Sequence, residues 1–167
     1  MTRIPPFRIG HGYDAHRFAK GRALVLGGVR IEHERGLAGH SDADVLTHAV
    51  IDAILGAMAL GDLGRHFPST DARWKDASSL DLLARARAMV EDAGGRVVQV
   101  DTLLYLERPK IANDVPQMRA VLARVLELPI ERISVKATTT DGMGFVGAEE
   151  GAAASAVVLV ATETDGG

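Results

Sequence analysis

The sequence contains no cysteine, so the fold uses no disulfide and any metal site must be built from His, Asp and Glu. It also has no run of about 18 apolar residues, which excludes a membrane-spanning helix. The first residues, Met1 to Phe7, lack the apolar centre of a secretory signal. We therefore expect a cytoplasmic protein without a membrane partner.

The sequence also has no excess of basic over acidic residues. The 22 Asp and Glu residues outnumber the 19 Lys and Arg residues, and the net charge of −3 argues against a nucleic-acid partner. With 167 residues, 47% of them hydrophobic, the chain is long enough to bury one core and short for two. We expect a single domain over residues 1–167, with its core at about 8–160 and short flexible termini.

The hydrophobic pattern predicts strands and helices in mixed order. Strands are expected at about 7–14, 23–26, 29–31, 96–106, 133–137 and 152–161, and helices at about 42–60, 77–93 and 113–127. This order favours an α+β layered sandwich, with helices on one face of a mixed sheet. Because alternate positions of the last strand are also apolar, we expect oligomerisation to cover the other face.

The predicted helix at 42–60 has an apolar face and a polar stripe. The apolar positions are Leu46, Val50, Ala53 and Ala57, and the polar ones are Asp44, His48 and Asp52. Ser41 followed by Asp44 resembles a capping box, so Asp44 is expected to start the helix rather than bind a ligand. Asp52 is either a solvated helix residue or a partner that holds His48 in one tautomer.

Three residues have spacings that suit one divalent metal ion. Asp14 and His16 are two apart, so on a strand both side chains leave the same face. His48 lies on the predicted helix and can close over that face. Three protein ligands leave a fourth tetrahedral position open, as in catalytic zinc sites. The spacing alone leaves open the alternative that these histidines are surface or hydrogen-bonded structural residues.

A second polar segment follows the strand at 133–137. The three hydroxyls of 138–140 and the carboxylate of Asp141 could bind phosphate oxygens and hold Mg²⁺ or Mn²⁺ against a diphosphate. The alternative is an ordinary threonine-rich strand end. Likewise, Pro109 and Lys110 either place a cation at a phosphate or form a surface turn.

Seven motifs, taken together and in order, are more specific than any of them alone. They are RIGHGYDAH, GGVRI, GLAGHSDADVLTH, ALGDLGRHFPSTD, PKI, VKATTTD and GFVGAEEG, and the similarity that they mark runs from about Arg8 to Val160. This set resembles the 2-C-methyl-D-erythritol 2,4-cyclodiphosphate synthases of the non-mevalonate isoprenoid pathway. The resemblance implies a phosphorus–oxygen lyase that closes a ring on its substrate and releases CMP.

The resemblance also implies how the site is assembled. It implies a homotrimer with active sites between subunits, each holding one Zn²⁺ and one Mg²⁺ or Mn²⁺ ion. By position, the zinc ligands are Asp14, His16 and His48, and Asp141 matches the residue at the second ion. His40 and Thr139 match the catalytic residues that orient the phosphates and stabilise the transition state.

The substrate, 4-diphosphocytidyl-2-C-methyl-D-erythritol 2-phosphate, is implied to contact several segments. The metal-side contacts are Asp14, His16, His40 and Ser41. The loop over the erythritol supplies Asp62, Leu63, Gly64, Phe67, Pro68, Ser69, Thr70 and Asp71. The cytidine diphosphate pocket comprises Leu106, Pro109, Lys110, Ala112, Thr138, Thr139, Thr140, Asp141 and Phe145.

The chain departs from the family pattern at three positions. Asp141 stands where the family usually has Glu, so its shorter arm reaches an ion less directly. Ser69 replaces a common Asp of the loop. Ala148 replaces an Arg that is associated with phosphate contact and with isoprenoid diphosphate binding in the trimer's central cavity, so we do not expect that regulatory binding here.

Two other functions fit the same residues. One is a different divalent-metal phosphohydrolase or phosphotransferase, which would release phosphate from simple esters and form no CMP. The other is a non-catalytic trimeric ligand-binding protein, which would be unaffected by chelators.

Overall fold

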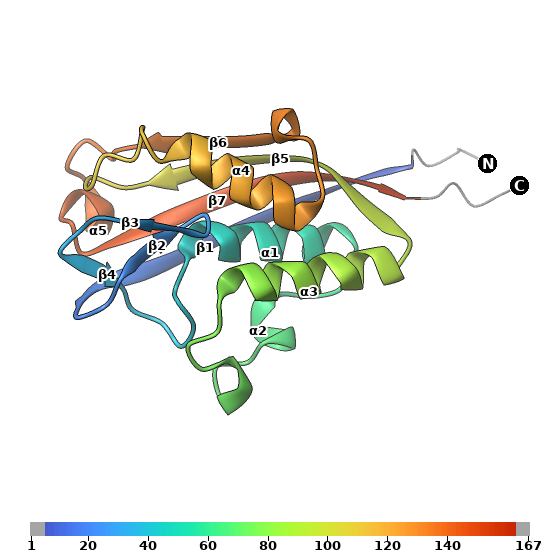
Figure 1. Ribbon diagram of the computed structural model, residues 1–167, viewed down its shortest axis with the longest axis horizontal. Coiled ribbons are helices and arrows are strands. Elements are labelled where there is room, and N and C mark those ends of the chain that lie inside the picture. The colour runs from blue at the N-terminus through green and yellow to red at the C-terminus, as the bar shows by residue number, and fades with distance from the viewer. Residues whose placement is uncertain (1–5, 163–167) are drawn as a thin grey trace, which may run out of the picture.

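Five strands form the main sheet of the computed structural model, which describes residues 6–162 (Figure 1). In spatial order they are β4 (Arg35–Leu37), β1 (Phe7–Lys20), β7 (Gly151–Thr162), β5 (Gly95–Tyr105) and β6 (Ile133–Thr138). Only the β5–β6 pair of this sheet is parallel, so the sheet is mixed, as the sequence predicted. The expected flexible termini fall largely on residues 1–5 and 163–167, which lie outside the described residues.

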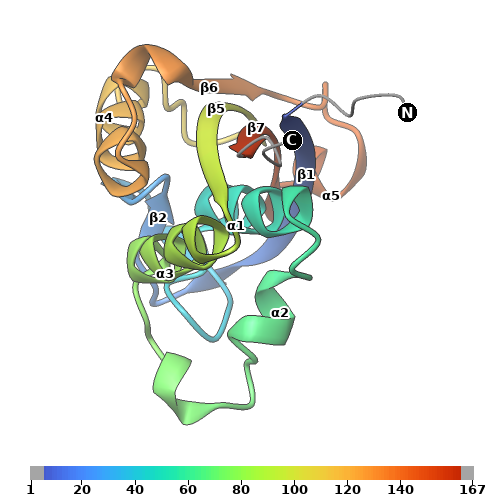
Figure 2. The same ribbon diagram turned by 90° about the vertical axis from the view of Figure 1, so that its right-hand side faces the viewer.

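Three long helices cover one face of the sheet. They are α1 (Val45–Ala57), α3 (Ser79–Asp92) and α4 (Val115–Leu126). Figure 2 shows them on the same side, with α1 against β1 and β7, and α4 beside β6. The predicted α+β fold with helices on a mixed sheet is therefore confirmed. No helix of residues 6–162 combines the length and the apolar character needed to cross a membrane.

Short elements fill the connections between these layers. A separate hairpin pairs β2 (Leu24–Leu26) with β3 (Val29–Ile31). The remaining elements are α2 (Leu63–His66), α5 (Gly144–Gly147) and single 3₁₀ turns at Ala72–Trp74 and Ile130–Arg132.

Two glycines of β1 let α1 lie directly on the strand. A Cβ atom at Gly10 would stand 1.8 Å from the carbonyl oxygen of Ala53, and one at Gly12 would stand 2.0 Å from that of Ala49. No side chain fits at either position, because real Cβ atoms do not approach backbone oxygens so closely. Because Gly10 and Gly12 have no side chains, α1 packs directly against β1. This close packing places His48 of α1 next to Asp14 and His16 of β1.

Strand β1 is longer than the sequence predicted. It continues to Lys20, pairing with β7 as far as Arg17 and then with the short strand β4, which the pattern did not reveal. The three-residue strand β4 is too short to show an alternation of its own.

The predicted capping box is wrong, although Asp44 does start the helix. The N-cap of α1 is Asp44 rather than Ser41, and its Oδ1 accepts the N–H of Thr47 at 3.0 Å. The same carboxylate accepts the N–H groups of Gly27 and Gly28 at 2.9 and 2.6 Å, so it ties the β2–β3 hairpin to α1. Asp44 is fully buried, and this burial raises the pKa of its carboxyl.

The face of the sheet opposite the helices exposes apolar side chains. Ile9 is 75% exposed, Tyr13 52% and Val157 47%, and all three lie on the neighbouring strands β1 and β7. Large side chains of this kind are usually covered when they cluster on a protein surface.

Candidate active site

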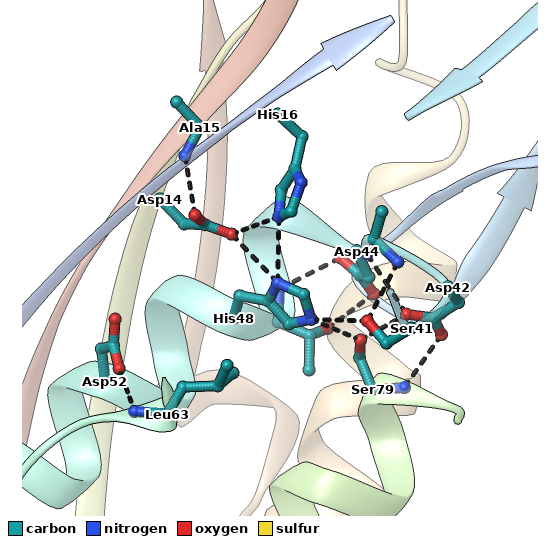
Figure 3. Close-up of polar contacts among 12 residues, drawn as sticks. Asp14, Ala15, His16, Ser41, Asp42, Asp44, His48, Asp52, Leu63 and Ser79 are labelled. Carbon is teal, nitrogen blue, oxygen red and sulfur yellow. Dashed lines mark hydrogen bonds and ion pairs between the residues drawn. The ribbon is translucent and has the colours of Figure 1, made fainter. Parts of the chain in front are cut away.

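The three predicted zinc ligands converge on one point. Figure 3 shows Asp14 and His16 leaving the same side of β1 and meeting His48 of α1. Asp14 Oδ2 lies 2.7 Å from His16 Nε2 and 3.0 Å from His48 Nδ1, and the two ring nitrogens are 3.2 Å apart. Around a zinc ion with bonds of about 2.0–2.1 Å, tetrahedral ligand atoms stand about 3.3 Å apart. The triad therefore has nearly the dimensions of one face of such a tetrahedron.

The outward nitrogens of both rings are already bonded. Nδ1 of His16 lies 2.6 Å from the carbonyl oxygen of Ala38, which can only accept, so this nitrogen carries a proton. Nε2 of His48 lies 2.9 Å from the hydroxyl of Ser79. Metal-bound histidines in proteins show this arrangement, in which the far nitrogen donates and the near one presents its lone pair.

The charges of the triad also favour a cation at its centre. Burial raises the pKa of Asp14, but hydrogen bonds and charge attraction to His16 and His48 together outweigh it, so the carboxyl pKa falls well below its usual value. Burial lowers the pKa of His16, but its hydrogen bond and charge attraction to Asp14, together with its bond to Ala38, outweigh burial, so the net pKa is raised. Either a proton or a metal ion satisfies this electrostatic demand, and the donor set of one carboxylate and two imidazoles fits a divalent metal.

The triad opens into a cavity of about 470 Å³. Of the predicted substrate contacts, those that line it are Asp14, His16, His40, Ser41, Asp62, Leu63, Gly64, Phe67 and Ser69. The predicted loop residues Pro68, Thr70 and Asp71 belong to the same segment but do not line the cavity. The carbonyl oxygen of Asp71 lies 3.3 Å from Nε2 of His40.

Asp52 lines this cavity as well, but it does not hold His48. Its carboxylate accepts the N–H of Leu63 at 2.7 Å and so fastens the start of α2 to α1. The interpretation of Asp52 as a tautomer-fixing partner is therefore wrong in this structure.

Trp74 forms part of the cavity wall and was not predicted from the sequence. Its ring packs edge-on against Phe67, with centroids 5.2 Å apart, and the guanidinium groups of Arg73 and Arg85 lie 5.4 and 5.5 Å from its centroid. No motif marked this residue, since it follows the recognised loop by three positions.

The other predicted contacts lie around a second cavity of about 430 Å³, near the ends of β5 and β6. Those that line it are Leu106, Pro109, Lys110, Ala112, Thr138 and Thr139. Thr140 does not line it, and its N–H donates to Oε1 of Glu107 at 2.9 Å. Asp141 is exposed, with φ of 55°, and Phe145 lines a third cavity beside His16 and Arg17.

The two predicted catalytic residues are thus not brought together within one chain. His40 lines the metal-side cavity, whereas Thr139 lines the second one. Asp141 is likewise not part of the Asp14, His16 and His48 group.

Fold and site define a single-domain α+β protein with an open, three-residue candidate metal site. The model of the YgbB family matches residues 7–161, and the chain belongs to this family. A curated relative from Salinibacter ruber, named 2-C-methyl-D-erythritol 2,4-cyclodiphosphate synthase, is 60% identical over 92% of this chain and 98% of its own length. The family assignment drawn from the motifs is confirmed.

Solved structures agree with this assignment. One of a 2C-methyl-D-erythritol-2,4-cyclodiphosphate synthase in its CDP-bound form has a TM-score of 0.85 and 39% identity, over 92% of this chain and 99% of that chain. The bifunctional IspDF of Campylobacter jejuni has a TM-score of 0.91 and 40% identity, over 95% of this chain and 43% of that longer chain.

Proposed function

We propose that this chain converts 4-diphosphocytidyl-2-C-methyl-D-erythritol 2-phosphate to 2-C-methyl-D-erythritol 2,4-cyclodiphosphate and CMP, in isoprenoid precursor biosynthesis. The observation that carries the proposal is the Asp14, His16 and His48 triad, open to a cavity in a member of this family. Curated relatives at 60% and 54% identity carry the synthase name, so neither a different phosphohydrolase nor a non-catalytic binding protein is favoured.

The reaction requires little base catalysis. The attacking group is the 2-phosphate of the substrate, which is already anionic, so the residues around the cavity need not remove a proton from a weak nucleophile. The obstacle is the repulsion between two phosphate groups that must approach each other. A Zn²⁺ at the triad and a Mg²⁺ or Mn²⁺ near Asp141 would neutralise phosphate charge and polarise the phosphorus–oxygen bonds.

The chain's own side chains then hold the substrate in place. His40 and Ser41 stand beside the triad, where an imidazole N–H and a hydroxyl can donate to phosphate oxygens. Phe67 and the short helix α2 enclose the same cavity and would keep water from the erythritol end. Fixing both ends of one substrate makes the attack a ring closure, in which positioning does much of the catalysis.

The cytidine diphosphate end is assigned to the second cavity. There Lys110 offers a cation, and Thr138 and Thr139 offer hydroxyls to phosphate oxygens. The solved relative in its CDP-bound form supports a nucleotide ligand of this kind. The shorter arm of Asp141 would reach its ion through water, and Ala148 gives no support for isoprenoid diphosphate binding.

A homotrimer would unite the two cavities. Two observations support it: His40 and Thr139 lie in separate cavities of one chain, and the sheet face around Ile9 and Tyr13 is exposed. In a ring of three chains, each metal-side cavity can face the nucleotide-side cavity of a neighbour. The cytoplasmic location stays a prediction.

The test is an assay of CMP release from the cytidyl substrate, with and without a chelator. We expect CMP and the cyclic diphosphate in equal amounts, loss of both after chelation, and recovery after adding Zn²⁺ with Mg²⁺ or Mn²⁺. Release of inorganic phosphate without CMP would instead favour a phosphohydrolase, and binding of CDP without turnover would favour a ligand-binding protein.

A further inference from the structure

The two histidines of the triad are supported from behind in different ways. His16 donates from Nδ1 to the backbone carbonyl of Ala38, which is a neutral acceptor. Nε2 of His48 instead meets two hydroxyls, at 2.9 Å in Ser79 and 3.2 Å in Ser41 (Figure 3). The second arrangement can connect His48 to a third residue, because a hydroxyl that accepts one hydrogen bond can donate another.

Ser79 passes its hydrogen bond to a carboxylate. Its hydroxyl donates to Oδ1 of Asp42, and its backbone N–H donates to Oδ2 of the same residue at 2.9 Å. The N–H of Asp44 is a third donor to this carboxylate, at 3.2 Å. Facing three donors, Asp42 acts as the acceptor at the end of the chain of bonds.

This arrangement fixes the direction of each bond. A serine hydroxyl has one hydrogen, and in Ser79 that hydrogen is directed to Asp42. The oxygen can therefore only accept from His48, so Nε2 of His48 carries the proton, and the lone pair of the neutral ring lies on Nδ1, the atom that would bind a metal ion in the triad. Ser79 is fully buried, which shields this bond from competing water.

We propose that Asp42 and Ser79 are positioning residues that hold His48 in the metal-binding tautomer and strengthen it as a ligand through a carboxylate–hydroxyl–imidazole chain. The proposal rests on the metal site proposed above. It assigns a role to two residues 37 positions apart that lie outside the substrate contacts. Partners of this kind typically change metal affinity 10- to 100-fold when removed.

The experiment compares zinc affinity in Ser79→Ala and Ser78→Ala, measured by competition with a chromophoric chelator. Ser78 is the neighbouring serine at the N-cap of α3 and makes no side-chain capping bond, so it is a matched control. We expect Ser79→Ala to bind zinc about 10- to 100-fold more weakly than wild type. Ser78→Ala should stay within about twofold of wild type.

A spectroscopic measurement adds a readout that a general loss of stability would not produce. In the cobalt-substituted protein, the visible absorption bands should shift in Ser79→Ala, because the donor strength of His48 changes, and stay unchanged in Ser78→Ala. Ser79→Thr keeps the hydroxyl and should restore both the affinity and the spectrum. Asp42→Asn keeps the size of the side chain and repeats the test if Ser79→Ala fails to fold.

The outcomes separate this proposal from the one on which it rests. If wild type binds one zinc per chain and Ser79→Ala and Asp42→Asn both bind it as tightly as Ser78→Ala does, the positioning role is overturned and the metal site stands. If wild type binds no zinc, and His48→Ala changes nothing, the metal site fails and the positioning role fails with it.

Discussion

The metal-side and nucleotide-side cavities differ in how much of each the chain itself completes. On the metal side, His48 and Ser41 are buried, and side chains from β1, α1 and α3 hold one another through direct hydrogen bonds. On the nucleotide side, Thr138 and Thr139 are exposed at the end of a strand. One half is thus preorganised by the fold, whereas the other presents its groups outward, where the proposed trimer would place a neighbouring subunit.

His48→Ala should have the largest effect, because it removes a ligand from the preorganised half. We expect zinc binding to be lost and CMP release to fall by at least about 10³-fold, while the proposed trimer remains largely assembled. Metal content by atomic spectroscopy, activity and sedimentation would be measured on the same sample. A variant that keeps full activity would contradict the role of His48.

Gly12→Ala tests whether the preorganised half depends on the contact between α1 and β1. The new Cβ would meet the carbonyl oxygen of Ala49 at 2.0 Å, so the helix must move and we expect a loss of about 4 kcal/mol in the free energy of unfolding. The movement should also weaken zinc binding.

The control is Gly56→Ala in the last turn of the same helix. There the nearest atom lies 4.0 Å away, and the higher helix propensity of Ala should stabilise the protein by about 0.5 kcal/mol. Denaturant unfolding of both variants would measure the contrast. Equal effects would mean that the close contact is unimportant.

Asp44→Ala probes the connection between the β2–β3 hairpin and α1. It would leave the buried N–H of Gly27 and the partly buried N–H of Gly28 without their acceptor and remove the helix cap, so we expect a loss of about 3 kcal/mol. Asp114 is the N-cap of α4 and makes no side-chain capping bond, so Asp114→Ala should cost under about 0.5 kcal/mol. Thermal unfolding midpoints would show the difference, and similar shifts in the two variants would refute it.

Thr139→Val should have the smallest of these effects and sharpens the comparison most directly. Loss of the hydroxyl removes one hydrogen bond to a charged phosphate and should lower kcat about 10- to 100-fold. Zinc affinity should not change, because Thr139 lies outside the metal-side cavity.

Mixing this variant with His48→Ala then tests whether a site is shared between chains. After unfolding and refolding equal amounts together, about one quarter of the shared sites should contain both intact residues, so activity should return to about that fraction of wild type. If each chain built its own complete site, the mixture would show no recovery above the two variants alone.

The sequence predicted the residues whose relation is set by regular periodicity. Asp14 and His16 share a face because a strand alternates, and His48 follows from the helix that the apolar spacing at Leu46 and Val50 predicts. The nucleotide-side residues were recognised through motifs. The motifs did not reveal that His40 and Thr139 line different cavities of one chain.

Other features depend on how distant segments meet. The contact of Ser79 with Asp42 and His48 joins the start of α3 to α1 and its preceding loop, and no local pattern encodes it. The bond from the N–H of Leu63 to Asp52 is another contact of this kind, because it depends on a turn whose path the sequence did not reveal.

Trp74, at the wall of the metal-side cavity, is the single tryptophan of the chain. The tryptophan emission of the protein therefore originates at one known place, against Phe67 and beside the segment expected to enclose the substrate. Tryptophan fluorescence can therefore report substrate entry and product departure at this cavity in real time, on the unlabelled protein.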